Sequence, residues 1–138
     1  MLGGADYLRS NGAERVIAGG ASIGAMASLH AAEQPSSNLD GVIWLAGVLR
    51  GSGYSFQEAD VTAVACPMLF ISGDEDTYGA ADAAQQLHDW APSASRLLIV
   101  DSRLHGTDIL DEDDRNAAAL TQAMFGFVDQ VANESSAC

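Results

Sequence analysis

Apolar residues alternate along the chain between short continuous runs and longer segments with helical spacing. Short runs bounded by Gly, Pro or Asp are typical of strands that are buried on both faces of a sheet. They predict strands over residues 16–20, 41–47, 67–72 and 96–100. Apolar residues three or four positions apart predict helices over residues 5–9, 22–33, 80–90 and 115–131.

Two segments between these elements have no clear periodicity. Residues 51–54, with the sequence GSGY, are expected to form a loop, and residues 56–64 are compatible with one or two helical turns. Strands that alternate with helices predict an α/β fold in three layers, with helices on both faces of a short, mostly parallel sheet. At 138 residues, the chain is expected to form one domain over residues 1–138.

The turn between the first strand and the following helix has the sequence GGASIG over residues 19–24. It contains the Gly-x-Ser-x-Gly pattern around Ser22, which is the pattern of a nucleophile elbow when a strand precedes it and a helix follows it. Small residues at such a turn let the helix pass close to the strand and lift the serine clear of the sheet. Ser22 is therefore a candidate nucleophile.

Other polar residues follow the later strands. Asp74 and Asp76 come after the third strand and His105 after the fourth. The carboxyl ends of parallel strands meet at one edge of a sheet, so these side chains are expected to approach Ser22. A serine needs a base to become nucleophilic, an imidazole can take and return the proton, and a carboxylate can orient the imidazole.

Spacing alone does not identify the carboxylate that partners His105. Asp74 competes with Asp76, and Asp108 is also near His105 in sequence. His30 and His88 lie in segments with helical periodicity and are expected to be solvated or packing residues.

The acidic composition limits the partners. The formal net charge is −13, which repels phosphate backbones and anionic membrane surfaces, so neither nucleic acid nor membrane binding is expected. The first residues lack the layout of a signal peptide and no apolar run has the length of a membrane span, so a cytoplasmic location is expected.

No cofactor or metal is expected. The chain lacks a glycine loop with the spacing that holds phosphates. Residues 74–79 resemble the opening of a calcium loop, but Tyr78 replaces an oxygen ligand and Gln85 stands where the bidentate glutamate belongs.

Three motifs in this order resemble the carboxyl-terminal part of an α/β-hydrolase. They are the Gly-x-Ser-x-Gly turn around Ser22, the run PMLFISGDED that ends at Asp76, and LHGT around His105. The resemblance is to small esterases and dienelactone-hydrolase-like enzymes. It implies that Ser22 is the nucleophile, His105 the base, Asp76 the orienting acid, and the backbone N–H of Ile23 an oxyanion donor. The implied reaction is hydrolysis of small carboxylic esters through an acyl-enzyme; lactone (dienelactone-like) or peptide hydrolysis is an alternative.

The chain departs from the family pattern before the elbow. The strands that the family places there, and the loop that supplies the second oxyanion donor, are expected to be absent, which makes the domain a truncated α/β-hydrolase fold. The strand over residues 16–20, bounded by Val16 and Gly20, then becomes a sheet edge. A homodimer that pairs along this edge or exchanges the segment around Tyr7 and Leu8 is expected. A further alternative is a weak or inactive remnant that serves as an interaction module.

Overall fold

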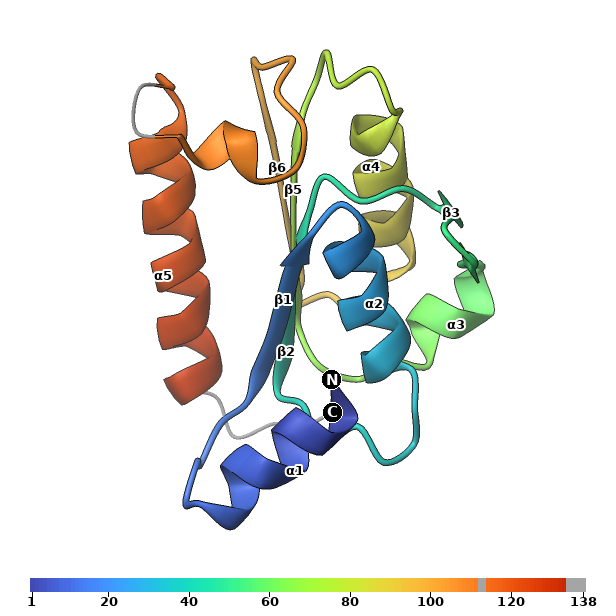
Figure 1. Cartoon of the computed structure of the whole chain (residues 1–138), viewed down its shortest axis with the longest axis vertical. Coiled ribbons are helices and arrows are strands. Elements are labelled where there is room, and N and C mark those ends of the chain that lie inside the picture. The colour runs from blue at the N-terminus through green and yellow to red at the C-terminus, as the bar shows by residue number, and fades with distance from the viewer. Residues whose placement is uncertain (112–113, 134–138) are drawn as a thin grey trace.

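A four-stranded parallel sheet lies at the centre of the computed structural model, which describes residues 1–111 and 114–133 (Figure 1). The strands are arranged in the order β1-β2-β5-β6. Their bounds are Ile17–Ala21 for β1, Gly41–Leu45 for β2, Met68–Gly73 for β5 and Arg96–Val100 for β6. The predicted α/β class and parallel sheet are confirmed.

Helices cover both faces of this sheet, as Figure 1 shows, with α5 on one face and α2 and α4 on the other. The helices are α1 (Leu2–Ser10), α2 (Ile23–Ala32), α3 (Glu58–Thr62), α4 (Ala80–Trp90) and α5 (Ala117–Asn133), with a 3-10 helix over Gly106–Leu110. The three predicted layers are therefore present, and α4 and β6 have the predicted bounds.

Side chains of the central strands alternate between two apolar cores. In β2, Val42 and Trp44 pack on the side of α2 and α4, while Ile43 and Leu45 pack on the side of α5. All of β2 and β5 is buried. This burial explains why both strands are continuous apolar runs.

The structure corrects the expected loop over residues 51–54. Two short antiparallel strands, β3 (Arg50–Gly51) and β4 (Tyr54–Ser55), form a hairpin there. The two-residue turn at Ser52 and Gly53 has φ values of 51° and 87°, so left-handed backbone closes the hairpin. The ambiguous segment over residues 56–64 contains the single short helix α3, and α1 begins three residues earlier than predicted.

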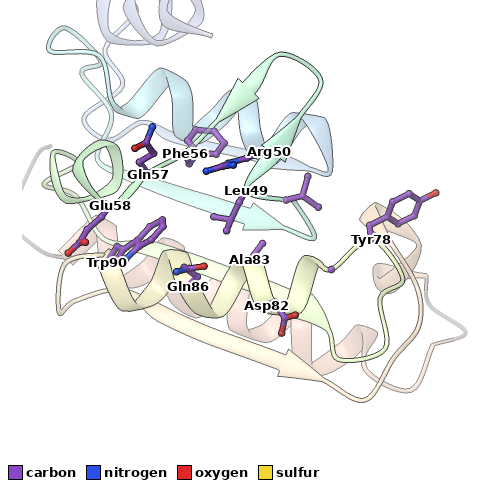
Figure 2. Close-up of a pocket in the computed structure, with 12 residues that line it drawn as sticks. Leu49, Arg50, Phe56, Gln57, Glu58, Tyr78, Asp82, Ala83, Gln86 and Trp90 are labelled. Atoms are coloured by element: carbon purple, nitrogen blue, oxygen red, sulfur yellow. The ribbon is translucent and has the colours of Figure 1, made fainter.

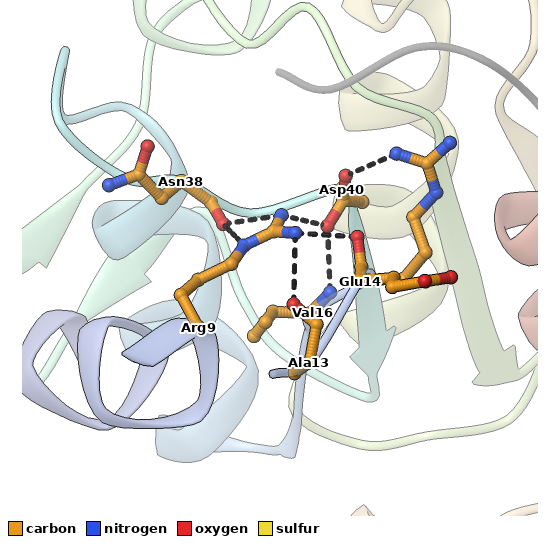
Figure 3. A network of polar contacts seen from close by, with 7 residues as sticks. Arg9, Ala13, Glu14, Val16, Asn38 and Asp40 are labelled. Carbon is orange, nitrogen blue, oxygen red and sulfur yellow. Dashed lines mark hydrogen bonds and ion pairs between the residues drawn. The ribbon is translucent and has the colours of Figure 1, made fainter. Parts of the chain in front are cut away.

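A buried carboxylate joins α1 to the amino end of the sheet (Figure 3). The Asp40 side chain is fully buried, pairs with Arg9 and Arg15, and accepts a hydrogen bond of 2.7 Å from the N–H of Val16. Arg9 also donates to the carbonyl oxygen of Asn38 at 3.1 Å. Two cations and a backbone donor thus compensate the buried charge.

β1 is an edge of the sheet, as expected, because in the described part of the chain it pairs only with β2. The strand spans Ile17–Ala21, one residue later than the predicted 16–20. Within residues 1–111 and 114–133, the helices are too short or too polar to cross a membrane.

Candidate active site

Ser22 occupies a strained turn between β1 and α2. Its φ of 52° and ψ of −119° lie outside the conformations that non-glycine residues commonly adopt. The Ser22 N–H donates to the carbonyl oxygen of Leu45 at 2.9 Å, which ties the turn to the end of β2. Such strain at an otherwise regular strand-to-helix junction is the conformation that the elbow motif predicts.

The close approach of strand and helix occurs at Gly20. A Cβ on Gly20 would lie 2.3 Å from the carbonyl carbon of Gly24. A Cβ on Gly24 itself would meet nothing within 4 Å, and one on Gly19 would make an ordinary contact with Ile43. Of the small residues expected to shape the turn, Gly20 is therefore the one that the helix packing requires.

The loops that follow β5 and β6 are tied together. The Ser102 N–H donates to Asp74 Oδ1 at 3.0 Å, and the Glu75 N–H donates to the carbonyl oxygen of Ser102 at 3.1 Å. A Cβ on Gly73 would lie 2.2 Å from that carbonyl oxygen, so only glycine allows the approach. These contacts fix the loop that contains Asp76 relative to the loop that contains His105.

Ser22, His105 and Asp76 form a continuous chain of side-chain hydrogen bonds. His105 Nδ1 lies 2.7 Å from Asp76 Oδ2, and His105 Nε2 lies 2.8 Å from Ser22 Oγ. The tautomer that donates Nδ1–H to the carboxylate leaves Nε2 free to accept the hydroxyl proton. The structure thus brings together three residues separated by up to 83 positions in the chain.

Asp76 is held on both carboxylate oxygens. Its side chain is fully buried, and Oδ1 accepts a hydrogen bond of 2.8 Å from the N–H of Tyr78. Asp74 instead bonds the backbone of Ser102, and Asp108 is exposed in the 3-10 helix. The geometry therefore selects Asp76 among the three carboxylates as the partner of His105.

His30 and His88 lie away from this chain of hydrogen bonds. His30 is exposed and its Nδ1 lies 3.3 Å from Glu33 Oε2. The His88 ring packs edge-on against Phe70, with centroids 6.3 Å apart. Both have the solvated or packing surroundings expected from their helical positions.

Ile23 is the first residue of α2, directly after Ser22. The N–H groups of a first helical turn have no partner within the helix and lie at the positive end of its dipole. The Ile23 N–H can therefore donate to an oxygen that develops negative charge on a group attached to Ser22.

Two carboxylates of the calcium-like loop over residues 74–79 form hydrogen bonds to other protein groups. Asp74 accepts from a backbone N–H, and Asp76 is bonded to His105 and Tyr78. No cluster of three or more His, Cys, Asp or Glu side chains suited to a metal ion occurs within the described ranges.

The sequence did not indicate the residues that support the site. Gly73 and Ser102 join the two loops, and the Tyr78 ring lies against His105 with centroids 4.4 Å apart. Gly73 directly after an apolar run is a signal for a tight approach, whereas nothing in the local sequence pairs Ser102 with Asp74, 28 positions away.

The fold is that of α/β-hydrolases. A dienelactone hydrolase from Anabaena variabilis matches with a TM-score of 0.69 and 22% identity over 89% of this chain and 54% of its own. A protein from Thermoplasma acidophilum described as a predicted CIB-like hydrolase matches with a TM-score of 0.68 and 22% identity over 93% of this chain and 59% of its own. An acylaminoacyl peptidase from Pyrococcus horikoshii matches with a TM-score of 0.75 and 16% identity over 95% and 27%.

The chain thus spans between about half and three fifths of the length of the first two of these structures. No protein-family model and no curated protein sequence matches it. Two of these neighbours are described as hydrolases and one as a peptidase, and at these identities the likeness establishes the shared fold.

Proposed function

We propose that this protein is a serine hydrolase that cleaves small carboxylic esters, with Ser22 as nucleophile, His105 as general base and Asp76 as the group that orients His105. The observation that supports it most strongly is the chain of hydrogen bonds of 2.8 Å and 2.7 Å through the two nitrogens of one imidazole. A structural serine has no need of a buried carboxylate behind its histidine partner.

The reaction proceeds in two steps. Ser22 Oγ attacks the ester carbonyl carbon as its proton passes to His105 Nε2, and the oxyanion accepts a hydrogen bond from the Ile23 N–H. The C–O bond to the alcohol then breaks, and the alcohol leaves with the proton from His105. Water, deprotonated by His105, attacks the acyl group and releases the acid and Ser22. Asp76 stabilises the imidazolium in both steps.

A pocket of about 590 Å³ beside the site has a volume suited to a small molecule (Figure 2). It lies between the segment that contains the β3–β4 hairpin and the helix α4, and Tyr78, which contacts His105, lines one end. Leu49, Phe56 and Trp90 supply apolar surface, and Arg50 is the cationic side chain that lines it. We assign the non-reacting part of the ester to this pocket.

Hydrolysis of 4-nitrophenyl acetate and butyrate tests the proposal. The wild-type protein is expected to turn over both, and Ser22→Ala is expected to fall to the background rate. Ser36→Ala is the matched control, because Ser36 is an exposed serine in a loop. Equal rates for wild type and Ser22→Ala would contradict the role of Ser22. Faster turnover of lactones than of these esters would favour a lactonase.

A second candidate is a weakly active or inactive hydrolase-fold module that acts through its sheet edge. Weak activity is supported by the oxyanion site, to which we assign one donor, the Ile23 N–H, in place of the two that the family pattern implies. Loss of one donor costs about a hundredfold or more in turnover. We also propose that two chains pair along β1, because among residues 1–111 and 114–133 this strand pairs only with β2 and its other side can accept a second strand. A stable monomer in light scattering at micromolar concentration would exclude the homodimer.

A further inference from the structure

The most exposed aromatic side chain beside the site belongs to Tyr78. Its exposed fraction is 68%. The ring does not pack into either apolar core. Its aromatic contact is with the imidazole of His105, at a centroid distance of 4.4 Å and an angle of 42° between the rings.

The two hydrogen bonds of His105 leave one kind of motion open. Both bonds, to Ser22 Oγ and Asp76 Oδ2, lie at the edge of the imidazole, so they resist sliding and rotation within the ring plane. They resist tilting about the line through the two nitrogens much less. His105 comes from a loop and its side chain is 26% exposed, so the ring is in partial contact with solvent.

We propose that Tyr78 is a positioning residue that holds the face of the His105 imidazole, and that this inference rests on the proposed serine hydrolase function. The tyrosine ring blocks the tilt that the two edge hydrogen bonds permit. The ring centroid also lies within cation–π distance, 4.4 Å, of the imidazolium that forms when Ser22 loses its proton. Tyr78 thus favours both the orientation and the charge of the base as the reaction proceeds.

The backbone of Tyr78 has a separate role, and this separation makes the ring testable. Its N–H donates to Asp76 Oδ1 at 2.8 Å, and Gly79, with a φ of 74°, follows at the start of α4. A change of side chain leaves both features in place. Tyr78→Leu therefore removes the ring alone, whereas Tyr78→Phe keeps the ring and removes the hydroxyl.

Phe125 provides a matched control. It has the same exposed fraction of 68% and lies on α5, across the sheet from α4 (Figure 1). Phe125→Leu removes an equally exposed ring without touching the site. Comparison with Tyr78→Leu therefore separates the loss of the His105 contact from the loss of a surface aromatic.

Two measurements on the full chain test the proposal. In NMR spectra we expect the ring current of Tyr78 to shift the His105 imidazole protons upfield, because the two ring centroids lie 4.4 Å apart. We expect this shift to be kept in Tyr78→Phe and Phe125→Leu and lost in Tyr78→Leu. The rate at which a fluorophosphonate probe labels Ser22, with loss of fluoride, is expected to fall about two- to fivefold in Tyr78→Leu and to stay unchanged in Phe125→Leu. Tyr78→Phe, which keeps the ring, is expected to restore most of the rate that Tyr78→Leu loses.

An unchanged His105 shift in Tyr78→Leu would overturn the contact. A lost shift with labelling as fast as in Phe125→Leu would overturn the positioning role while leaving the proposed function intact. Absence of labelling in the wild type would refute the proposed function and the positioning role together, and the NMR shift would still report the contact. Slow labelling in Tyr78→Leu, with restoration in Tyr78→Phe, supports the proposal.

Discussion

Replacement of Gly20 by alanine tests whether the elbow controls the reactivity of Ser22. The added Cβ would lie 2.3 Å from the carbonyl carbon of Gly24, 2.4 Å from its oxygen and 2.9 Å from the amide nitrogen of Ala25. Carbon atoms in contact need about 3.5 Å. Because the obstacle is the backbone of α2, the first turn of that helix must move by about 1 Å.

This movement is expected to affect both stability and chemistry. Forced overpacking of this kind costs about 1–3 kcal/mol. Ser22 and Ile23 begin α2, so a shift of its first turn also displaces the hydroxyl from His105 and the N–H from the oxyanion. A misplacement of about 1 Å can cost roughly a hundredfold in rate. The labelling rate of Ser22 by a fluorophosphonate should fall by about that factor.

Gly24→Ala is the control for this experiment. A Cβ at Gly24 meets nothing within 4 Å, and alanine in a helix is favoured over glycine by about 1 kcal/mol. The unfolding free energy from urea denaturation should rise in Gly24→Ala and fall in Gly20→Ala. If folded Gly20→Ala were labelled as fast as Gly24→Ala, close packing at Gly20 would not control the geometry of Ser22.

Three further variants test other parts of the account. Asp76→Asn should lower 4-nitrophenyl acetate turnover by about 10⁴-fold, and Asp74→Asn much less; equal losses would contradict the choice of Asp76. Asp40→Asn should lower the unfolding free energy by about 3 kcal/mol, since it uncouples a buried carboxylate from two arginines; a urea midpoint like that of the wild type would oppose this. Burial, and then repulsion from Asp60, raise the pKa of the Glu33 carboxyl above 4.5. The native state therefore binds the carboxyl proton more tightly than the unfolded chain does. Because this proton is released as the pH rises through and above 4.5, the protein loses stability over that range. Glu33→Gln should therefore stabilise the protein at pH 7 and not at pH 4, and an equal gain at both pH values would refute this assignment.

The sequence predicted the fold well because most of it depends on local patterns. Strands β2 and β5 are buried on both faces, so their residues form unbroken apolar runs with visible ends. The β3–β4 hairpin was missed because its four paired residues are too few to show alternation. In addition, Ser52 takes the left-handed backbone conformation at a turn position where Asn or Asp would have indicated a hairpin.

The candidate site was predictable where a motif defines it and not where tertiary packing does. Ser22 and His105 follow strands in recognisable contexts, and their contact follows from the edge at which parallel strands end. The choice between Asp74 and Asp76 depends on the turn of one loop, which the sequence left open. The Tyr78 contact with His105 joins two loops and has no local pattern.

Intact-protein mass spectrometry after treatment with a fluorophosphonate measures whether His105 activates Ser22. We predict a single adduct on the wild-type chain, mapped to Ser22, and no adduct on His105→Ala at the same exposure time. His88→Ala, which removes a histidine outside the hydrogen-bonded chain, should label like the wild type. An unlabelled folded wild type, or equal labelling of His105→Ala, would contradict the claim that His105 activates Ser22.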